Sequence, residues 1–264
     1  MALLSCPTEA ALQLSDDDIR IALCERLGAP RCPPDICTRR FRSGRTCGGA
    51  LGGGWHAYCC PGLAGLRTQV RHNALVREFV SILTSAGRFV RVEQRDPLMG
   101  PTARLDIVEL ASAEGGAAAY DVSVVTPFRS DPTFVQACGR TEGWAAAQKH
   151  DAKLRRQYSD RVPGALLVPL VVEGGGRWHP SVPPLLRKLA RAYVRRSPEL
   201  PATAVGPVLR RWATRLSAAL VRGNGHTVRA VVPSSGLTGA HLVGVAGLPH
   251  CSPEGDSSYE LLVR

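Results

Sequence analysis

The spacing of apolar residues predicts an amphipathic helix over residues 75–86, within a patterned region that starts near Leu66. Five apolar residues fall at i, i+4, i+7, i+8 and i+11: Leu75, Phe79, Ile82, Leu83 and Ala86. This is the spacing of one helix face, and Gly87 is suited to end the last turn. The next stretch, RFVRVEQ at 88–94, alternates apolar and polar residues and predicts a half-buried strand.

Further strands and helices follow along the chain. Two apolar runs, at 104–110 and 120–125, predict strands joined by a turn of small residues, and ALLVPLVVE at 165–173 predicts another. Helices are predicted at 14–27, 133–158, 182–195 and 204–222. From residue 66 the order is helix, three strands, helix, strand and two helices. It predicts an α/β domain in which helices cover a mixed sheet.

The two ends of the chain have a different composition. Residues 29–64 are rich in Pro, Gly, Cys and Arg and show no sustained period, so we expect them to be loose or held together by a metal. The tail after Gly223 is rich in Gly, Ser and Pro, and we expect it to be poorly ordered. The predicted units are 1–64 with the Cys/His-rich module, 65–225 with the α/β domain, and 226–264 as a flexible tail.

Charge and cysteine usage narrow the functional classes. The formal net charge of +11 comes mainly from arginine and favours DNA, or else RNA, as the partner over a solvated basic surface without one. The first residues do not form a signal peptide, and no apolar run is long enough to span a bilayer, so we expect no membrane association. In the intracellular compartment that this implies, clustered Cys and His favour a metal over disulfides.

Each of the two middle strands carries one aspartate, Asp106 and Asp121. If these strands pair, the two carboxylates converge, and a hard divalent cation such as Mg²⁺ relieves their repulsion and activates water against a phosphodiester. Glu93 is a possible third acid. A lysine often completes such a site, but Ser123 occupies the simplest position, so the following helix offers Lys149 or Lys153. Without further support, aspartates that only end strands or cap turns remain the more frequent case.

Several segments occur in an order that points to a family. They are CGGALGGGWHAYCC, RHNALVREFVSILTSAGRFVRVEQ, ARLDI, YDVSVV, KHDAKLRRQY and LLVPLVVEGGG. In this order, over roughly residues 14–225, the chain resembles the C-terminal part of site-specific non-LTR retrotransposon proteins. In that family a zinc knuckle precedes a restriction-endonuclease-like domain of the PD-(D/E)XK class.

The resemblance implies a hydrolase that nicks target DNA, so that a reverse transcriptase can prime from the free 3′ end. Asp106 and Asp121 would be its metal-binding acids for Mg²⁺ or Mn²⁺, and Lys153, with Lys149 second, its displaced lysine. The segment 71–73, Arg-His-Asn, matches the family's entry to the first helix, with DNA contact or helix capping as its role. Such an activity would place the protein in the nucleus.

The zinc knuckle implied by the resemblance takes two Cys before a His-x3-Cys. His56 and Cys60 match its second half and Cys47 its first. The fourth ligand is Cys37 or, behind it, Cys32, and Cys59 is an alternative to Cys60. Since a structural zinc needs four ligands, the predicted set is Cys37, Cys47, His56 and Cys60, and the alternative is a cysteine-rich loop that has lost its metal.

Three departures from the family favour a second interpretation: the lysine is displaced from position 123, Arg45 stands two residues before Cys47 where a close Cys pair is expected, and no reverse transcriptase domain is found in the 264 residues. Leu105 also replaces the family's proline before the first aspartate, which is a tolerable change. We therefore expect a fragment, a degenerate copy or a domesticated remnant. In the last two cases the protein would be a catalytically inactive module that binds nucleic acid, and a polymerase domain would be a separate partner.

Overall fold

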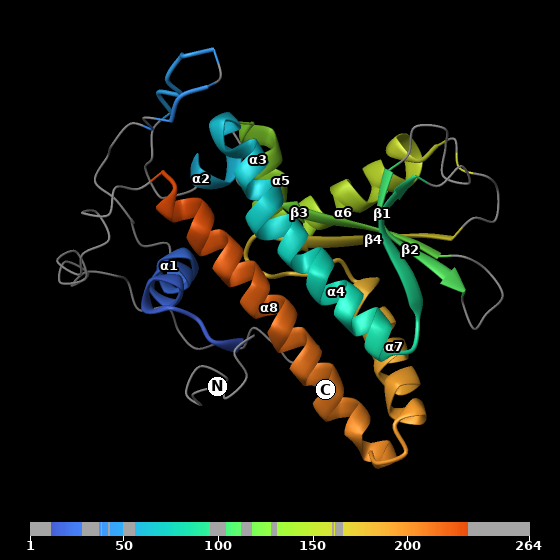
Figure 1. Ribbon diagram of the computed structural model, residues 1–264. Helices are drawn as coiled ribbons and strands as arrows, with labels where there is room; N and C mark the ends of the chain where they lie inside the picture. The colour runs from blue at the N-terminus through green and yellow to red at the C-terminus, as the bar shows by residue number, and fades with distance from the viewer. Residues whose placement is uncertain are drawn as a thin grey trace.

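The structure, a computed structural model, describes residues 12–27, 37, 39–41, 43–49, 56–95, 104–111, 118–127, 131–159, 161 and 166–231. Within them the chain forms a mixed α/β fold, as predicted, in which a four-stranded mixed sheet is flanked by helices (Figure 1). Cys32 and the segment 232–264 lie outside the described residues.

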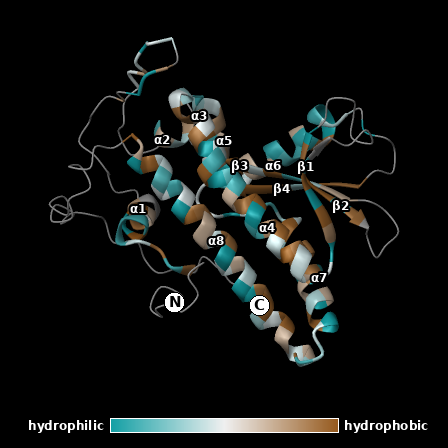
Figure 2. Ribbon diagram, in the orientation of Figure 1, coloured by the Kyte–Doolittle hydropathy of each residue, from teal (hydrophilic) through white to brown (hydrophobic). Residues whose placement is uncertain are grey.

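The sheet has the strand order β1-β2-β3-β4. Its strands are β1 (Phe89–Arg95), β2 (Arg104–Ala111), β3 (Ala118–Val125) and β4 (Leu166–Glu173). The first three pair antiparallel and β4 lies parallel to β3. Figure 2 shows the strands as largely apolar, as expected for a sheet that is covered on both faces.

The larger core lies between one face of the sheet and the helices α4 (Asn73–Ser85), α7 (Val182–Arg196) and α8 (Val205–Arg229). The short helix η7 (Ala202–Ala204) leads into α8. Tyr120 and Val122 of β3 and Leu170 of β4 contribute to this core. All five apolar residues that predicted the first long helix are buried in it: Leu75, Phe79, Ile82, Leu83 and Ala86.

The other face of the sheet is covered by α5 (Pro132–Arg140), α6 (Trp144–Ala152) and the π-helix η6 (Lys153–Gln157). Ala145 and Ala146 of α6 pack on Val125 and Val171, which alternate along their strands with residues of the larger core. The sequence predicted one helix over 133–158. The structure instead breaks it at residues 141–143, where Gly143 has a left-handed backbone with φ of 70°.

A second, smaller core joins the N-terminal segments to the end of α8. It contains Ile21 of α1 (Asp16–Leu27), Tyr58 of α2 (His56–Cys59), Leu63 of η3 (Pro61–Leu63), and Val228. The chain then passes through α3 (Ala64–Arg67) and the π-helix η4 (Thr68–His72) into α4. Helix α8 therefore continues past residue 222, where the sequence predicted its end, to Arg229. Among the described residues no helix has the length and apolar character needed to cross a membrane.

Candidate functional site

A hairpin brings the first two predicted zinc ligands together. The amide of Cys37 donates to Gly49 O at 2.8 Å, and the amide of Gly48 donates back to Cys37 O at 3.0 Å. A Cβ at Gly49 would lie 2.3 Å from Cε1 of His56, so a side chain there would displace the imidazole ring. The ring of His56 therefore lies directly against the end of the hairpin that carries Cys37 and Cys47.

Helix α2 begins with the third ligand, His56, and the fourth, Cys60, follows directly after its end. The Sγ atoms of Cys37 and Cys60 lie 3.8 Å apart, as do those of Cys60 and Cys47, and Cys47 Sγ lies 3.4 Å from His56 Nε2. All four ligand atoms lie within 4.8 Å of one another. A tetrahedral zinc with Zn–S bonds of about 2.3 Å requires sulfur atoms about 3.8 Å apart, so these distances are compatible with zinc.

The protonation states of these groups also suit a metal. Burial and the charge of Arg67 lower the pKa of His56, which favours the neutral imidazole that binds metals. Burial and the hydrogen bond with Cys47 raise the pKa of Cys60 to about 12, so a cation is needed to hold this sulfur as a thiolate. Cys59, the alternative to Cys60, is exposed, with its Sγ 3.6 Å from His56 O. We call the described residues of 37–49 and 56–60 the Cys/His module.

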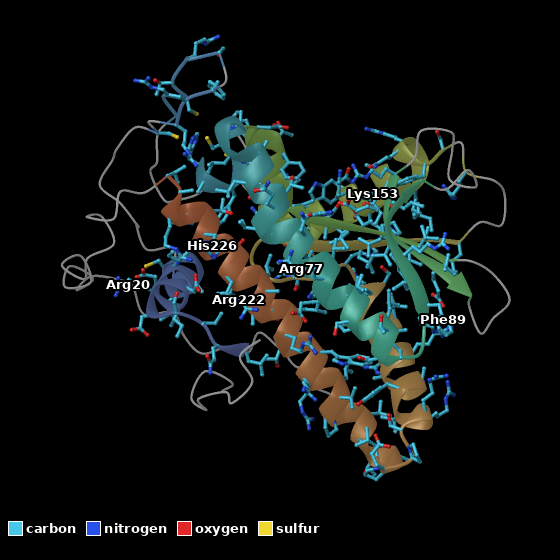
Figure 3. The ribbon with its side chains drawn as sticks, viewed as in Figure 1. Arg20, Arg77, Phe89, Lys153, Arg222 and His226 are labelled. Atoms are coloured by element: carbon cyan, nitrogen blue, oxygen red, sulfur yellow. The ribbon has the colours of Figure 1, made fainter. Side chains whose placement is uncertain are left out.

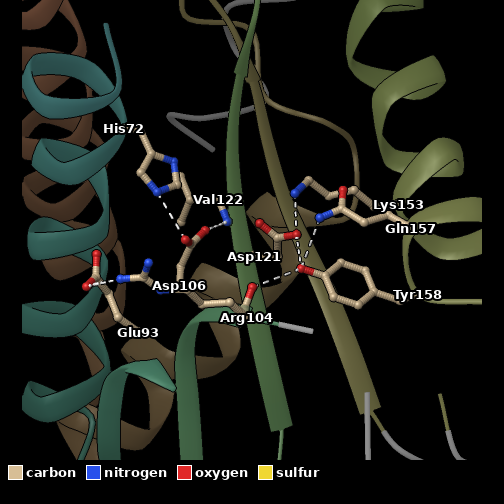
Figure 4. A network of polar contacts seen from close by, with 9 residues as sticks. All are labelled: His72, Glu93, Arg104, Asp106, Asp121, Val122, Lys153, Gln157 and Tyr158. Atoms are coloured by element: carbon tan, nitrogen blue, oxygen red, sulfur yellow. Dashed lines mark hydrogen bonds and ion pairs between the residues drawn. The ribbon is translucent and has the colours of Figure 1, made fainter. Parts of the chain in front are cut away.

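The two aspartates lie opposite each other where β2 and β3 separate. The last pair of the ladder is Ile107 with Tyr120, and the same register places Asp106 opposite Asp121. Beyond this pair, the carboxylate of Asp106 takes the place of a backbone acceptor on β2, since Val122 N of β3 donates to its Oδ2 at 2.7 Å. Figure 4 shows both side chains at this point of the sheet. The predicted convergence of the two acids is therefore present in the geometry.

Asp106 has a second partner on the side of α4. His72 Nε2 lies 3.0 Å from Asp106 Oδ1 (Figure 4). Burial alone would lower the pKa of His72, but the hydrogen bond and the negative charge of Asp106 raise it. Burial alone would raise the pKa of Asp106, but the hydrogen bonds and charge of its neighbours, His72 first, lower it. Asp106 is therefore held as a carboxylate.

Asp121 is bound from the opposite side of β3. Its Oδ2 accepts a hydrogen bond from the Tyr158 hydroxyl at 2.6 Å and forms an ion pair with the ammonium of Lys153. Burial raises the pKa of Asp121, as does the charge of Asp106, and the Lys153 and Tyr158 contacts oppose this only in part. We call His72, Asp106, Asp121, Lys153 and Tyr158 the acidic cluster.

The helical segment that carries Lys153, α6 continued by η6, is held on the sheet by a further acid, Glu173. Glu173, at the end of β4, accepts a hydrogen bond from Ala146 N in the first turn of α6 at 3.2 Å, and its carboxylate is buried. A carboxylate is stabilising at a helix N-terminus, so this contact orients α6 and η6. Figure 3 shows the Lys153 side chain beside the strands of the sheet.

Both basic side chains of the acidic cluster, His72 and Lys153, lie on π-helical turns. His72 is the last residue of η4 and Lys153 the first of η6. Turns of this kind are rare and occur often at functional sites, because the wider turn redirects a side chain. No sequence pattern predicts either turn, or the contacts of His72 and Tyr158 with the aspartates.

Two predicted site residues lie elsewhere. Glu93 does not join the aspartates: its side chain is 57% exposed, and its carboxylate accepts a hydrogen bond from Arg104 Nη2 at 2.5 Å. The lysine that pairs with Asp121 is Lys153, whereas Lys149 is partly exposed one turn earlier on α6. For the Arg-His-Asn segment, neither DNA contact nor capping describes Arg71, which is buried with its guanidinium 5.1 Å from the centre of the Tyr58 ring.

The two clusters differ in what they could hold. Among the described residues, the Cys/His module contains the one group of three or more side chains placed to hold a metal ion. The acidic cluster offers the oxygens of two aspartates, and Mg²⁺ in proteins often takes one or two carboxylates and completes its shell with water and phosphate. The donor chemistry fits Mg²⁺, but the described residues do not form a Mg²⁺ site by themselves.

Comparison of the chain with models of protein families, with curated proteins and with solved structures gives no match.

Proposed function

We propose that this protein is a metal-dependent endonuclease that hydrolyses a phosphodiester bond of DNA. The observation that carries the proposal is the acidic cluster, in which two carboxylates from neighbouring strands lie next to the buried ammonium of Lys153. Carboxylates that face each other together with a lysine are suited to phosphoryl chemistry, because they combine a cation site with a fixed positive charge.

Each residue of the acidic cluster has a separate task in the proposed reaction. Asp106 and Asp121 would hold the cation, which when bound supplies Lewis acidity and lowers the pKa of a bound water. Lys153 would stabilise the negative charge that develops on the phosphate. His72 donates to Asp106 and Tyr158 donates to Asp121, so these two residues fix the orientation of the carboxylates.

The positive charge of the protein supports a polyanionic substrate. Helix α7 presents several basic residues to solvent, among them Lys188, Arg191, Arg195 and Arg196. Basic side chains along a helix bind phosphates by a charge interaction that weakens as salt concentration rises. DNA binding, or RNA binding, should therefore decrease steeply between low and high ionic strength.

A nicking assay tests the proposal. Supercoiled plasmid is incubated with Mg²⁺ or Mn²⁺ and the wild-type protein, Asp121→Asn or Lys153→Met, and relaxation to the open circle is followed on a gel. Removal of a metal ligand or of the charge-stabilising lysine should reduce nicking by about a hundredfold or more. Asp17→Asn and Arg20→Met, which alter an exposed ion pair on α1, are the controls and should nick as the wild type does. Equal nicking by all five proteins would overturn the proposal.

One observation favours the alternative, a nucleic-acid-binding protein without cleavage. The Lys153 ammonium and the Tyr158 hydroxyl both occupy Asp121 Oδ2, and the side chains of Lys153 and Asp121 are only 5% and 7% exposed. In a remnant that no longer cuts, such a closed ion pair would simply stabilise the fold. Salt-dependent binding of DNA or RNA, with no cleavage at any metal concentration, would establish this function.

The Cys/His module enters the proposal as a structural zinc site with Cys37, Cys47, His56 and Cys60 as ligands. Its distances are compatible with tetrahedral coordination, and all four positions are taken by the protein, as is usual for structural rather than catalytic zinc. The restriction-endonuclease-like identity of the sheet, the retrotransposon origin, a reverse transcriptase partner and a nuclear location belong to the same proposal. They rest on the order and spacing of the sequence segments.

A further inference from the structure

Two successive side chains of η4 contact the two clusters. Arg71 is 3% exposed, and its guanidinium lies over the ring of Tyr58, which stands between the ligands His56 and Cys60. The next residue, His72, binds Asp106 Oδ1. A single π-helical turn therefore links the Cys/His module to the acidic cluster.

Helix α8 holds this turn in place. Gly223 lies against η4 so closely that a Cβ there would come within 2.6 Å of Val70 O and 2.8 Å of Arg71 Cγ. The adjacent Asn224 donates from Nδ2 to Gly174 O at 2.8 Å, in the turn after β4. Because η4 is packed between α8 and the sheet, a displacement of Arg71 is transmitted to its neighbours rather than absorbed.

The Cys/His module has little apolar packing of its own. The buried residues that it contributes to the smaller core are Cys37, Ala57, Tyr58 and Cys60, two of which are predicted ligands, whereas the larger aliphatic side chains of that core, Ile21, Leu63 and Val228, come from outside the module. A segment of this kind depends on its metal for a defined structure. The position of Tyr58, and therefore that of the Arg71 guanidinium that packs on its ring, should depend on the metal.

We propose that the Cys/His module acts as a structural support for the acidic cluster, with Tyr58, Arg71 and His72 as the positioning residues that fix the carboxylate of Asp106. This inference gives the module a role inside the protein rather than as a separate nucleic-acid-binding arm. It rests on the proposed function for the meaning of Asp106 as a metal ligand, but the coupling itself can be measured without DNA and without Mg²⁺.

Amide hydrogen exchange on the zinc-loaded protein and on the protein treated with a chelator tests the coupling. The reporters are the amides of η4 and the amide of Val122, which donates to Asp106 Oδ2. Chelation should raise their exchange rates by about tenfold or more, as local opening becomes easier, while amides in the middle of α7, at Leu186 and Leu189, keep their rates. Unchanged rates in η4 and at Val122 would overturn the proposal, and so would an equal increase in α7.

Tyr58 separates the coupling from metal binding, because it is not a ligand. Tyr58→Leu should keep one zinc per chain, measured by atomic emission, and still raise the exchange rates of η4 and Val122. Tyr58→Phe retains the aromatic face under the guanidinium and should restore the wild-type rates. Tyr193→Leu removes an aromatic side chain that contacts Trp212 instead and should leave Val122 unaffected. Wild-type exchange rates in zinc-loaded Tyr58→Leu would show that η4 does not couple the Cys/His module to Asp106 and Val122.

The outcome is independent of the nicking assay. If the protein cuts no DNA but chelation exposes Val122, the proposed function fails and the support remains. If the protein cuts DNA and neither chelation nor Tyr58→Leu changes the exchange of Val122, the support alone is wrong.

Discussion

Asp106 and Asp121 face each other on neighbouring strands, yet their pKa values shift in opposite directions. The pKa of Asp106 is lowered by His72 and the Val122 amide against the effect of burial, whereas burial raises that of Asp121. The pair therefore divides into a carboxylate and a group that holds its proton more strongly. Such a division is expected where two acids share a confined site, and a cation would remove it by favouring both charged forms.

The buried ion pair of Asp121 and Lys153 predicts a large loss of stability when one partner is removed. Asp121→Asn leaves the ammonium of Lys153 buried without its counter-charge and should lower the free energy of unfolding by about 3–5 kcal/mol. The double variant Asp121→Asn, Lys153→Met removes both charges and should recover most of this loss. Urea unfolding of the wild type, Asp121→Asn and the double variant measures the three free energies of unfolding.

An exposed ion pair is the matched control for this measurement. Arg20 and Asp17 are paired at 3.3 Å, with side chains 38% and 43% exposed. Asp17→Asn should change the free energy of unfolding by less than about 1 kcal/mol, because solvent screens the pair. If Asp121→Asn costs no more than Asp17→Asn, the Lys153 ammonium is not held by Asp121 in solution.

The Cys/His module predicts one tightly bound zinc per chain. Cys37→Ser or Cys47→Ser removes one of four ligands and should abolish stoichiometric zinc, measured by atomic emission after dialysis, and lower the melting temperature. Cys59→Ser is the matched control, because Cys59 is adjacent to Cys60 but exposed and outside the group. Loss of zinc from Cys59→Ser, with zinc retained by Cys37→Ser, would contradict the ligand set.

Those elements that depend on local spacing could be predicted from the sequence. The 3.6-residue repeat at Leu75 and Phe79 marks α4, and the alternating and apolar runs mark all four strands. The fourth ligand Cys37 could be chosen only by proximity along the chain, and the structure places it with the other three. In these cases the signal lies in nearby residues.

The remaining features depend on tertiary contacts. His72 meets Asp106 across 34 residues, and Tyr158 meets Asp121 across 37, so no spacing rule predicts either bond. The break between α5 and α6 comes from a single left-handed glycine, Gly143, inside a sequence that otherwise favours helix. The closing position of α8 was missed because Gly223, a poor helix former, serves close packing there.

The stacked rings of His150 and His179 predict a loss of stability in acid. Their centroids lie 3.8 Å apart at an interplanar angle of 11°, on α6 and on the segment between β4 and α7. Burial lowers the pKa of both below 6.5, with the charge of His150 adding to the effect at His179, while Asp151 opposes it at both. The folded state therefore binds fewer protons than the unfolded chain. The contribution of the two neutral rings to the free energy of unfolding is complete above pH 6.5 and is lost as the pH falls below it.

Urea unfolding at about pH 7.5 and about pH 5.5 checks the effect of the two rings. His179→Gln removes one ring and should make the loss between the two pH values smaller than in the wild type. His226→Gln, at an exposed position near the end of α8 (Figure 3), should show the wild-type loss. The pKa of His72 shifts in the opposite direction, and its effect on stability is the same in all three proteins. The test therefore compares the pH-dependent loss between the proteins. An identical loss in His179→Gln and the wild type would exclude the stacked pair as its cause.

The close approach of α8 to η4 predicts that alanine at residue 223 destabilises the protein, although alanine favours helix by about 1 kcal/mol over glycine. A Cβ at Gly223 would overlap backbone, Val70 O at 2.6 Å, which cannot move aside without shifting η4. Gly223→Ala should lower the free energy of unfolding by about 1–3 kcal/mol, the usual cost of overpacking, measured by urea unfolding. Gly206→Ala, in the first turn of the same helix, meets only the flexible end of Arg210 at 3.9 Å, so it should leave stability unchanged or raise it by up to about 1 kcal/mol. Equal effects of the two substitutions would mean that η4 does not pack on α8 at Gly223.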